Sequence, residues 1–269
     1  MRRGIVADGN RRFRTLFISD VHLGTRGCQA EQLLDFLRGH DADTIYLVGD
    51  IVDGWQLKST WHWPQAHNDV VQKLLRKGRK GARLIYVPGN HDEFLRGYYG
   101  THFGGIEVVA NAVHVAANGL RYIVTHGDQF DLVVKNARWL AHLGDHAYTL
   151  ALAANTTLNW VRRRLGLPYW SISRWAKARV KNAVNYIGDF ETTLSHEAQR
   201  HATDGVICGH IHHAVIREIA NVRYINCGDW VESCSAAVEH FNGEFEILTW
   251  TARASGSIED APALEVQAA

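Results

Sequence analysis

The stretch LVGDIVD at residues 47–53 ends an apolar run on a carboxylate, Asp50, and a second carboxylate follows at Asp53. The run before it, residues 44–48, is typical of a buried strand, so Asp50 is expected at a strand's carboxyl end. A strand that stops at Gly-Asp is common and is weak evidence for a site by itself. The interpretation of Asp50 therefore depends on what the neighbouring strands carry.

Four other predicted strands also end in polar side chains. Their ranges and polar ends are 15–19 with Asp20 and His22, 83–87 with Asn90, His91 and Asp92, 121–125 with His126 and Asp128, and 205–208 with His210 and His212. Alternate side chains of a strand share one face, so Asp20 and His22 are expected on one side of the chain. Helical patterns at 29–39 and 66–78 separate the first strands, which predicts an α/β fold with a site at the strands' carboxyl ends.

The polar side chains at these strand ends form a candidate set of metal ligands. Carboxylate, amide oxygen and imidazole without thiolate suit Mn²⁺, Fe²⁺, Zn²⁺ or a similar divalent ion. The set has too many members for one ion and suits two, if Asp50 is shared: Asp20, His22, Asp50, Asn90, His126, His210 and His212. Alone, His126 or His210 is more often a core or turn residue, and Asn90 a turn former. Their joint occurrence favours a two-metal site, which activates water and neutralises a phosphoryl group.

Composition limits the class of protein. A chain of 269 residues suits one large domain with an insertion or two small domains, and 29 basic against 28 acidic residues argue neither for nor against a polyanionic partner. The four cysteines form no CxxC pair, which favours a reducing cytosol. Neither an export signal nor an uncharged membrane-spanning run is apparent. We expect a domain at 14–250, with disordered tails at 1–13 and 251–269.

A long, mainly helical insertion is expected at residues 129–201. Its segment 146–188 has no acidic residue but contains Arg174, Lys177 and Lys181 among several tryptophans and tyrosines. One interpretation is a solvated basic hairpin that packs on the sheet through its aromatic residues. The other is a lid that offers cations to phosphate and apolar surface to a lipid or aromatic group.

The ordered motifs resemble those of the calcineurin-like metallophosphoesterase superfamily over about residues 15–250, without most of the insertion. The motifs are Asp20-x-His22, Gly49-Asp50-x-x-Asp53, Gly89-Asn90-His91-Asp92, His126-Gly127-Asp128 and Gly209-His210-x-His212. The resemblance implies an αββα sandwich of two mixed sheets flanked by helices, with the metals at one edge and a helical lid. It also implies a first metal on Asp20, His22, Asp50 and His212, and a second on Asp50, Asn90, His126 and His210. His91 would be the general acid or transition-state stabiliser, oriented by Asp92.

Within this superfamily, the insertion and Gly228-Asp229-Trp230 resemble the UDP-2,3-diacylglucosamine diphosphatases of lipid A biosynthesis. The resemblance implies hydrolysis of UDP-2,3-diacylglucosamine to UMP and 2,3-diacylglucosamine 1-phosphate. Two divalent ions are expected, with Mn favoured over Fe, Zn, Ni or Mg. The apolar faces and arginines of the insertion favour peripheral contact of a cytoplasmic enzyme with the inner face of the membrane. The expected substrate contacts are Arg174, Lys177, Lys181 and Asp128.

Other functions stay open at this point. The best-known members of that branch have Arg where this chain has His91, which leaves room for a related branch or a broader phosphodiesterase. A nuclease or cyclic-nucleotide phosphodiesterase would use the insertion as a basic aromatic platform. A non-enzymatic scaffold of the same fold is disfavoured, because every ligand position is filled.

Overall fold

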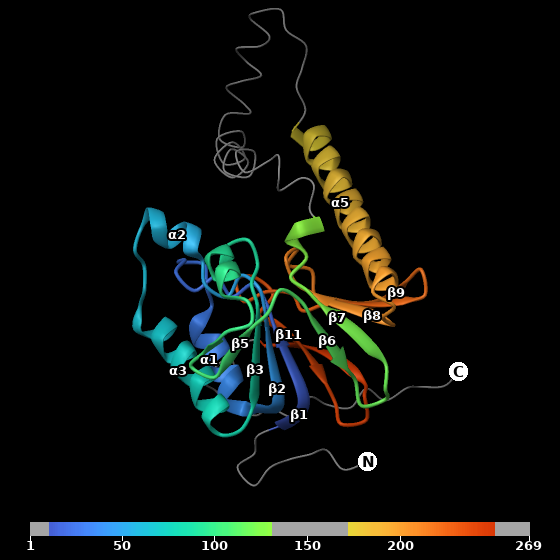
Figure 1. The fold of residues 1–269 in the computed structure, drawn as a ribbon. Coiled ribbons are helices and arrows are strands. Elements are labelled where there is room, and N and C mark those ends of the chain that lie inside the picture. The colour runs from blue at the N-terminus through green and yellow to red at the C-terminus, as the bar shows by residue number, and fades with distance from the viewer. Residues whose placement is uncertain (1–10, 131–171, 251–269) are drawn as a thin grey trace, which may run out of the picture.

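The computed structural model describes residues 11–130 and 172–250, with side chains described from residue 186 onward in the second range. Within these residues two sheets pack face to face (Figure 1). The seven-stranded sheet has the spatial order β12 (Phe245–Thr249), β11 (Ser235–Glu239), β1 (Arg11–Ile18), β2 (His40–Val48), β3 (Arg83–Val87), β5 (Ile106–Val108) and β4 (His102–Phe103). The five-stranded sheet has the order β6 (Ala112–Val115), β7 (Arg121–Val124), β8 (Gly205–Cys208), β10 (Val222–Asn226) and β9 (Val215–Ile219).

Helices cover the outer faces of both sheets. The helices α1 (Ala30–Gly39) and α3 (Gln65–Arg79) bury one apolar stripe each against the first sheet. On the second sheet α5 (Ile172–Arg200) buries Phe190, Leu194 and Ala198, which are four residues apart and therefore share one helix face. The layers α1/α3, sheet, sheet and α5 make the expected αββα sandwich (Figure 1).

The core between the sheets is built from alternating strand residues. Phe17 of β1 stacks on Tyr46 of β2 with ring centroids 5.0 Å apart, and both face Ile207 and Ile225 of the second sheet. The neighbours Leu16 and Ile18 point the other way, into the layer under α1 and α3. Strands of this kind are buried on both faces, which explains their nearly continuous apolar sequences.

Two expectations about the strands were wrong. The apolar patterns at residues 235–240 and 245–250 predict antiparallel strands that close the second sheet. The corresponding strands β11 and β12 belong instead to the first sheet, because β11 pairs antiparallel with β1. Apolar alternation marks a strand but does not say which edge it pairs with. The expected N-terminal tail was also too long, since β1 starts at Arg11, which pairs with His40 of β2.

Several short elements had no clear sequence signal. They are α2 (Gly54–Ser59), the 3₁₀ helices η1 (Glu93–Tyr98) and η2 (Asp128–Phe130), and strands β4 and β9. Most of the expected insertion, residues 131–171, lies outside the described residues, as do 1–10 and 251–269 of the expected tails. In the described part of the chain, none of the helices has the length and apolar character needed to cross a membrane.

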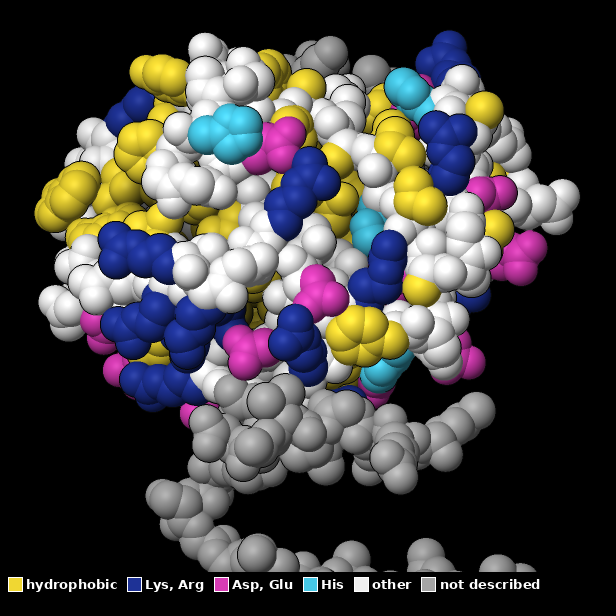
Figure 2. Space-filling model, turned by 60° about the horizontal axis from the view of Figure 1, so that its bottom comes forward, with side chains coloured by type: hydrophobic (Ala, Val, Ile, Leu, Met, Phe, Trp, Pro, Cys, Tyr) yellow, Lys and Arg dark blue, Asp and Glu magenta, His cyan; other side chains and the backbone are white. Residues whose placement is uncertain are grey.

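The two ends of the sandwich differ in character. Strands β1, β2 and β3 run parallel to one another, as do β7, β8 and β10, so carboxyl ends gather at one edge in each sheet. On the face shown in Figure 2, basic side chains stand beside acidic ones. Ion pairs near the amino ends of β1, β2 and β3 join Arg12 to Asp43 at 2.6 Å and Arg83 to Glu107 at 2.7 Å.

Candidate metal centre

The loops after β1, β2 and β8 place candidate ligands by an unusual backbone conformation. Five of these residues have left-handed φ angles: Asp20 (51°), His22 (54°), Asp50 (54°), His210 (72°) and His212 (53°). Non-glycine residues rarely adopt this conformation, and it tends to persist at functional sites where the surroundings enforce it. Strand alternation therefore does not place Asp20 and His22, as was expected, because β1 already ends at Ile18.

Hydrogen bonds between backbones hold the first two loops together. The amides of Val21 and His22 both donate to the carbonyl oxygen of Asp50, at 3.0 and 2.9 Å. The Asp20 amide donates to the carbonyl oxygen of Gly49 at 3.0 Å. The Asp20 and Asp50 motifs are thus one structural unit, although 30 residues of chain separate them.

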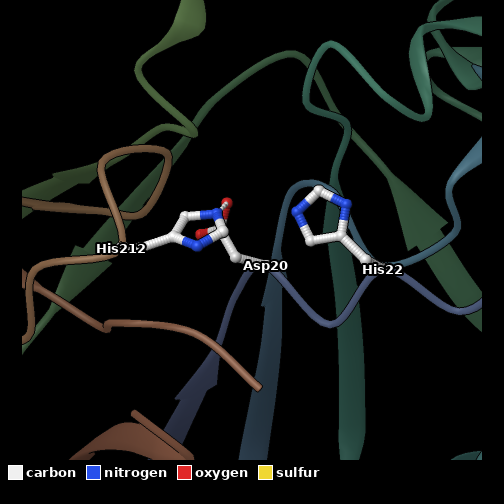
Figure 3. A group of neighbouring side chains, drawn as sticks. All are labelled: Asp20, His22 and His212. Atoms are coloured by element: carbon white, nitrogen blue, oxygen red, sulfur yellow. Dashed lines mark ion pairs between the residues drawn. The ribbon is translucent and has the colours of Figure 1, made fainter. Parts of the chain in front are cut away.

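The candidate ligands fall into two main groups. Asp20, His22 and His212 form the first, and Figure 3 shows His212 beside the Asp20 carboxylate with His22 across from them. Asp50, His126 and His210 form the second. Within each group the potential ligand atoms lie within 4.8 Å of one another, close enough to bind one ion. Asp50 also groups with His22 and His91, so it lies between the two main groups.

Four atoms of the candidate ligands have no hydrogen-bond partner although they are buried. They are Asp20 Oδ1, His22 Nε2, Asn90 Oδ1 and His126 Nε2. Two of them lie close to another candidate ligand, Asp20 Oδ1 at 3.2 Å from His212 Nε2 and His126 Nε2 at 3.3 Å from Asp50 Oδ2. Buried polar atoms without a partner are rare and call for an explanation such as an ion. Carboxylate oxygen, amide oxygen and imidazole nitrogen all bind divalent cations, so the residues present fit a metal centre.

The other ring nitrogens of two histidines are already engaged. His22 Nδ1 lies 3.1 Å from Asp53 Oδ2, and His126 Nδ1 lies 3.0 Å from the carbonyl oxygen of Val48. An Nδ1–H donated to oxygen leaves Nε2 with a lone pair, as a metal ligand needs. The protein thus orients both rings with Nε2 toward the candidate ions.

The site favours positive charge. Burial acts to raise the pKa of Asp50, but the imidazole of His126 outweighs it, and the pKa of Asp50 lies well below its usual value. Conversely, burial acts to lower the pKa of His126, but the carboxylate of Asp50, with its Oδ2 3.3 Å from Nε2, raises it well above the usual value. Carboxylates held ionised in a buried site attract cations, which again fits metal binding.

Asp92 does not orient His91 in the expected way. Its carboxylate accepts from the amides of Gly89 and Ile51, at 2.6 and 2.8 Å, and from the Tyr86 hydroxyl at 2.5 Å. These bonds hold the turn that carries His91, not its ring. The ring's Nδ1 instead lies 2.8 Å from Asp53 Oδ2.

Asp53, which was expected only as the last residue of the Asp50 motif and behind the metal ligands, therefore contacts the His91 ring, and Trp55 emerges as a site residue that sequence reasoning did not select. Asp53 also caps α2, since its Oδ1 accepts from the Gln56 amide at 2.7 Å, and a carboxylate before a helix is usually only a cap. Its spacing from Asp50 was the available signal. The Trp55 ring packs against the His91 ring with centroids 4.2 Å apart, and nothing in the sequence distinguishes this tryptophan from the others.

The expected substrate contacts are placed only in part. Asp128 lies close enough to the candidate ligand His126 to help raise the pKa of that imidazole. It pairs with Arg96 at 2.6 Å, a contact that the sequence did not suggest. Arg174, Lys177 and Lys181 belong to α5, but their side chains lie outside those that the structure describes.

Comparisons with known proteins show which family and which proteins this chain is similar to. A family model described as calcineurin-like phosphoesterase matches residues 13–214. A protein named UDP-2,3-diacylglucosamine hydrolase from Psychromonas ingrahamii is 26% identical and covers 82% of this chain and 91% of its own. Its namesake from Nitrosococcus oceani is 27% identical over 82% and 89% of the two chains. A solved phosphoesterase from E. coli, Yfce, is 16% identical with a TM-score of 0.42, and the match covers 88% of this chain and 98% of that one.

Proposed function

The chain belongs to the calcineurin-like phosphoesterase family. We propose that it hydrolyses the pyrophosphate bond of UDP-2,3-diacylglucosamine at two divalent ions. The products are UMP and 2,3-diacylglucosamine 1-phosphate, a step of lipid A biosynthesis. The observation that carries the metal chemistry is the set of buried ligand atoms without a hydrogen-bond partner, among them His22 Nε2 and Asn90 Oδ1.

We assign four ligands to each ion, with Asp50 shared. The first ion is held by Asp20, His22, Asp50 and His212, and the second by Asp50, Asn90, His126 and His210. Mn²⁺ is the favoured metal for this mixed set, with Fe, Zn, Ni and Mg as alternatives. When bound, two such ions neutralise the phosphoryl oxygens and activate water for attack.

His91 supplies the proton that the leaving group needs. With Nδ1 beside Asp53 Oδ2 at 2.8 Å, the Nε2 side of the ring faces Asp50 Oδ2, 4.0 Å away. The Asp53 carboxylate and the Trp55 ring fix the orientation of the imidazole. His91 then donates a proton from Nε2 to the oxygen that leaves phosphorus, which avoids an uncompensated negative charge.

The choice of substrate is supported by the named relatives and by the insertion. Two UDP-2,3-diacylglucosamine hydrolases align with more than four fifths of the chain. Arg174, Lys177 and Lys181 are suited to the substrate's phosphates, while the tryptophans around them suit its acyl chains. An acylated substrate of this kind lies in the membrane, so we expect a cytoplasmic enzyme that contacts the inner membrane surface. Flotation with anionic liposomes tests this location, and protein that stays wholly unbound would argue against it.

Asp50→Ala tests the metal centre. The variant is expected to lose metal-dependent hydrolysis by at least about 10³-fold, because the shared ligand of both ions is gone. It is also expected to lose the increase in melting temperature that Mn²⁺ produces in the wild type. Asp43→Asn, an exposed carboxylate on the same strand paired with Arg12, is the matched control. Retained turnover in the Asp50 variant would refute the two-metal assignment.

Incubation with UDP-2,3-diacylglucosamine and Mn²⁺ tests the substrate. UMP and the acylated sugar 1-phosphate are expected as products in equal amounts, with the Asp50 variant as the blank. Absence of UMP, alongside turnover of a nucleic acid or a cyclic nucleotide by the same preparation, would exclude the lipid substrate and keep the reaction class.

A further inference from the structure

We propose that Arg96 binds the second phosphate of a diphosphate substrate beside the metal centre, and that Asp128 holds the guanidinium in position. This inference rests on the proposed function, because only a substrate with two linked phosphates offers a second phosphate to bind. One phosphate lies at the metal ions and the other is available to a nearby cation.

Two segments that carry candidate ligands connect Arg96 to the metal centre. Arg96 lies on η1, the 3₁₀ helix that directly follows Asn90, His91 and Asp92. Its partner Asp128 comes two residues after the candidate ligand His126, and two residues span at most about 7 Å. The Arg96–Asp128 pair therefore joins two of the loops that carry the candidate ligands.

The guanidinium is only partly used by the protein. One terminal nitrogen lies 2.6 Å from Asp128 Oδ2, while Nε is buried without an acceptor among the described residues. Arginine carries five N–H donors in a rigid fork, so donors remain for a phosphate. The Arg96 side chain is 36% exposed and Asp128 only 12%, which leaves the guanidinium as the accessible partner.

The pairing also changes the role expected for Asp128. A carboxylate repels phosphate and would not bind it directly, but it can fix the plane of an arginine that does. Asp128 is therefore a positioning residue, whose effect on the substrate passes through Arg96. Without this carboxylate a flexible arginine would lose side-chain entropy on binding, which weakens recognition.

The test compares inhibition by UDP and by UMP, which differ by one phosphate. Hydrolysis of bis(4-nitrophenyl) phosphate with excess Mn²⁺ reports inhibition, and each variant is compared with its own uninhibited rate. Arg96→Ala is expected to weaken inhibition by UDP about 10- to 100-fold more than inhibition by UMP, the effect of one charged hydrogen bond. Asp128→Asn is expected to give a smaller change in the same direction.

Two further variants make the result decisive. Arg83→Ala, which removes an exposed arginine paired with Glu107 at the far end of β3, should leave the UDP to UMP ratio unchanged. If Asp128 left unpaired prevents folding of Arg96→Ala, Arg96→Met combined with Asp128→Asn removes both charges and should lose the same preference for UDP. An equal loss of UDP and UMP inhibition, or no loss, would overturn the proposal. Failure to hydrolyse UDP-2,3-diacylglucosamine would contradict the proposed substrate but leave this comparison intact.

Discussion

The Asp53 carboxylate contacts two imidazole rings, His22 and His91, and each contact serves a different purpose. One contact turns His22 Nε2 toward the first ligand group, and the other orients the proposed acid His91. Burial acts to raise the pKa of Asp53, but its bonds with these histidines outweigh burial and lower it. The Asp53 carboxylate is therefore ionised and can accept a hydrogen bond from each of the two imidazole rings.

His91→Gln is expected to slow hydrolysis by about 10²- to 10⁴-fold for a diester with an alkoxide leaving group, which needs a proton. The loss should be much smaller for a 4-nitrophenolate leaving group, which departs without one. Asp53→Asn is expected to show the same dependence on the leaving group, in addition to weaker Mn²⁺ binding. His201→Gln, an exposed histidine paired with Glu197, is the control. Equal losses for both leaving groups would exclude His91 as a proton donor.

At the scale of elements, the turn after β2 shows why a strand end becomes a site. Gly49 has a φ of 76°, and a Cβ built there would overlap the His126 ring. The following residue, Asp50, also has a positive φ, so the chain turns sharply and presents its carboxylate at the edge of the sheet. Glycine is required here by conformation and by space together.

Gly49→Ala is therefore expected to lower the free energy of unfolding by at least about 1–2 kcal/mol, since it combines a left-handed conformation with overlap. Displacement of His126 should also weaken Mn²⁺ binding, measured by isothermal titration. Gly39→Ala is the matched control, because nothing lies within 4 Å of a Cβ at the end of α1. Equal unfolding curves for the two variants, by urea titration, would contradict this account of the turn.

At the scale of the whole molecule, a buried carboxylate joins strands of both sheets away from the metal centre. Glu239 of β11 accepts from Arg14 and Thr15 of β1, and its Oε2 lies 2.8 Å from His114 Nε2 on β6. The Ala117 amide donates to its other oxygen at 2.7 Å. Burial acts to raise the pKa of Glu239, but these bonds lower it to about 2.

A lowered pKa means that ionised Glu239 stabilises the folded protein above pH 4.5, its ordinary value, and that this contribution disappears as the pH falls toward 2. Glu239→Gln is expected to reduce the free energy of unfolding by about 3 kcal/mol at pH 7, because Arg14 loses its buried partner. The difference from the wild type, measured by urea unfolding, should shrink between about pH 5 and 3. Glu246→Gln on neighbouring β12, an exposed partner of His240, should show no such change. A constant difference at all pH values would contradict the role of Glu239.

The local pattern predicted most elements and most candidate ligands but not their pairing. The strands ending near Asp20, Asp50, His126 and His210 were predicted from apolar runs alone, and the structure brings these residues into two groups. The edge to which β11 pairs was not predictable, because an apolar strand buried on both faces fits either sheet. The left-handed conformations were not predictable either, since isolated Asp and His rarely adopt them.

The sequence by itself determined which chemical groups this protein holds: carboxylates, an amide and imidazoles at successive strand ends, together with the α/β class that gathers those ends. Only the tertiary structure decided which group acts on which. It directed Asp53 rather than Asp92 to the His91 ring, and it joined Asp128 to Arg96. The physical reason is that residue type and hydrophobic periodicity are local properties, whereas a contact of about 3 Å between distant residues depends on how strands pair and loops turn in the folded chain.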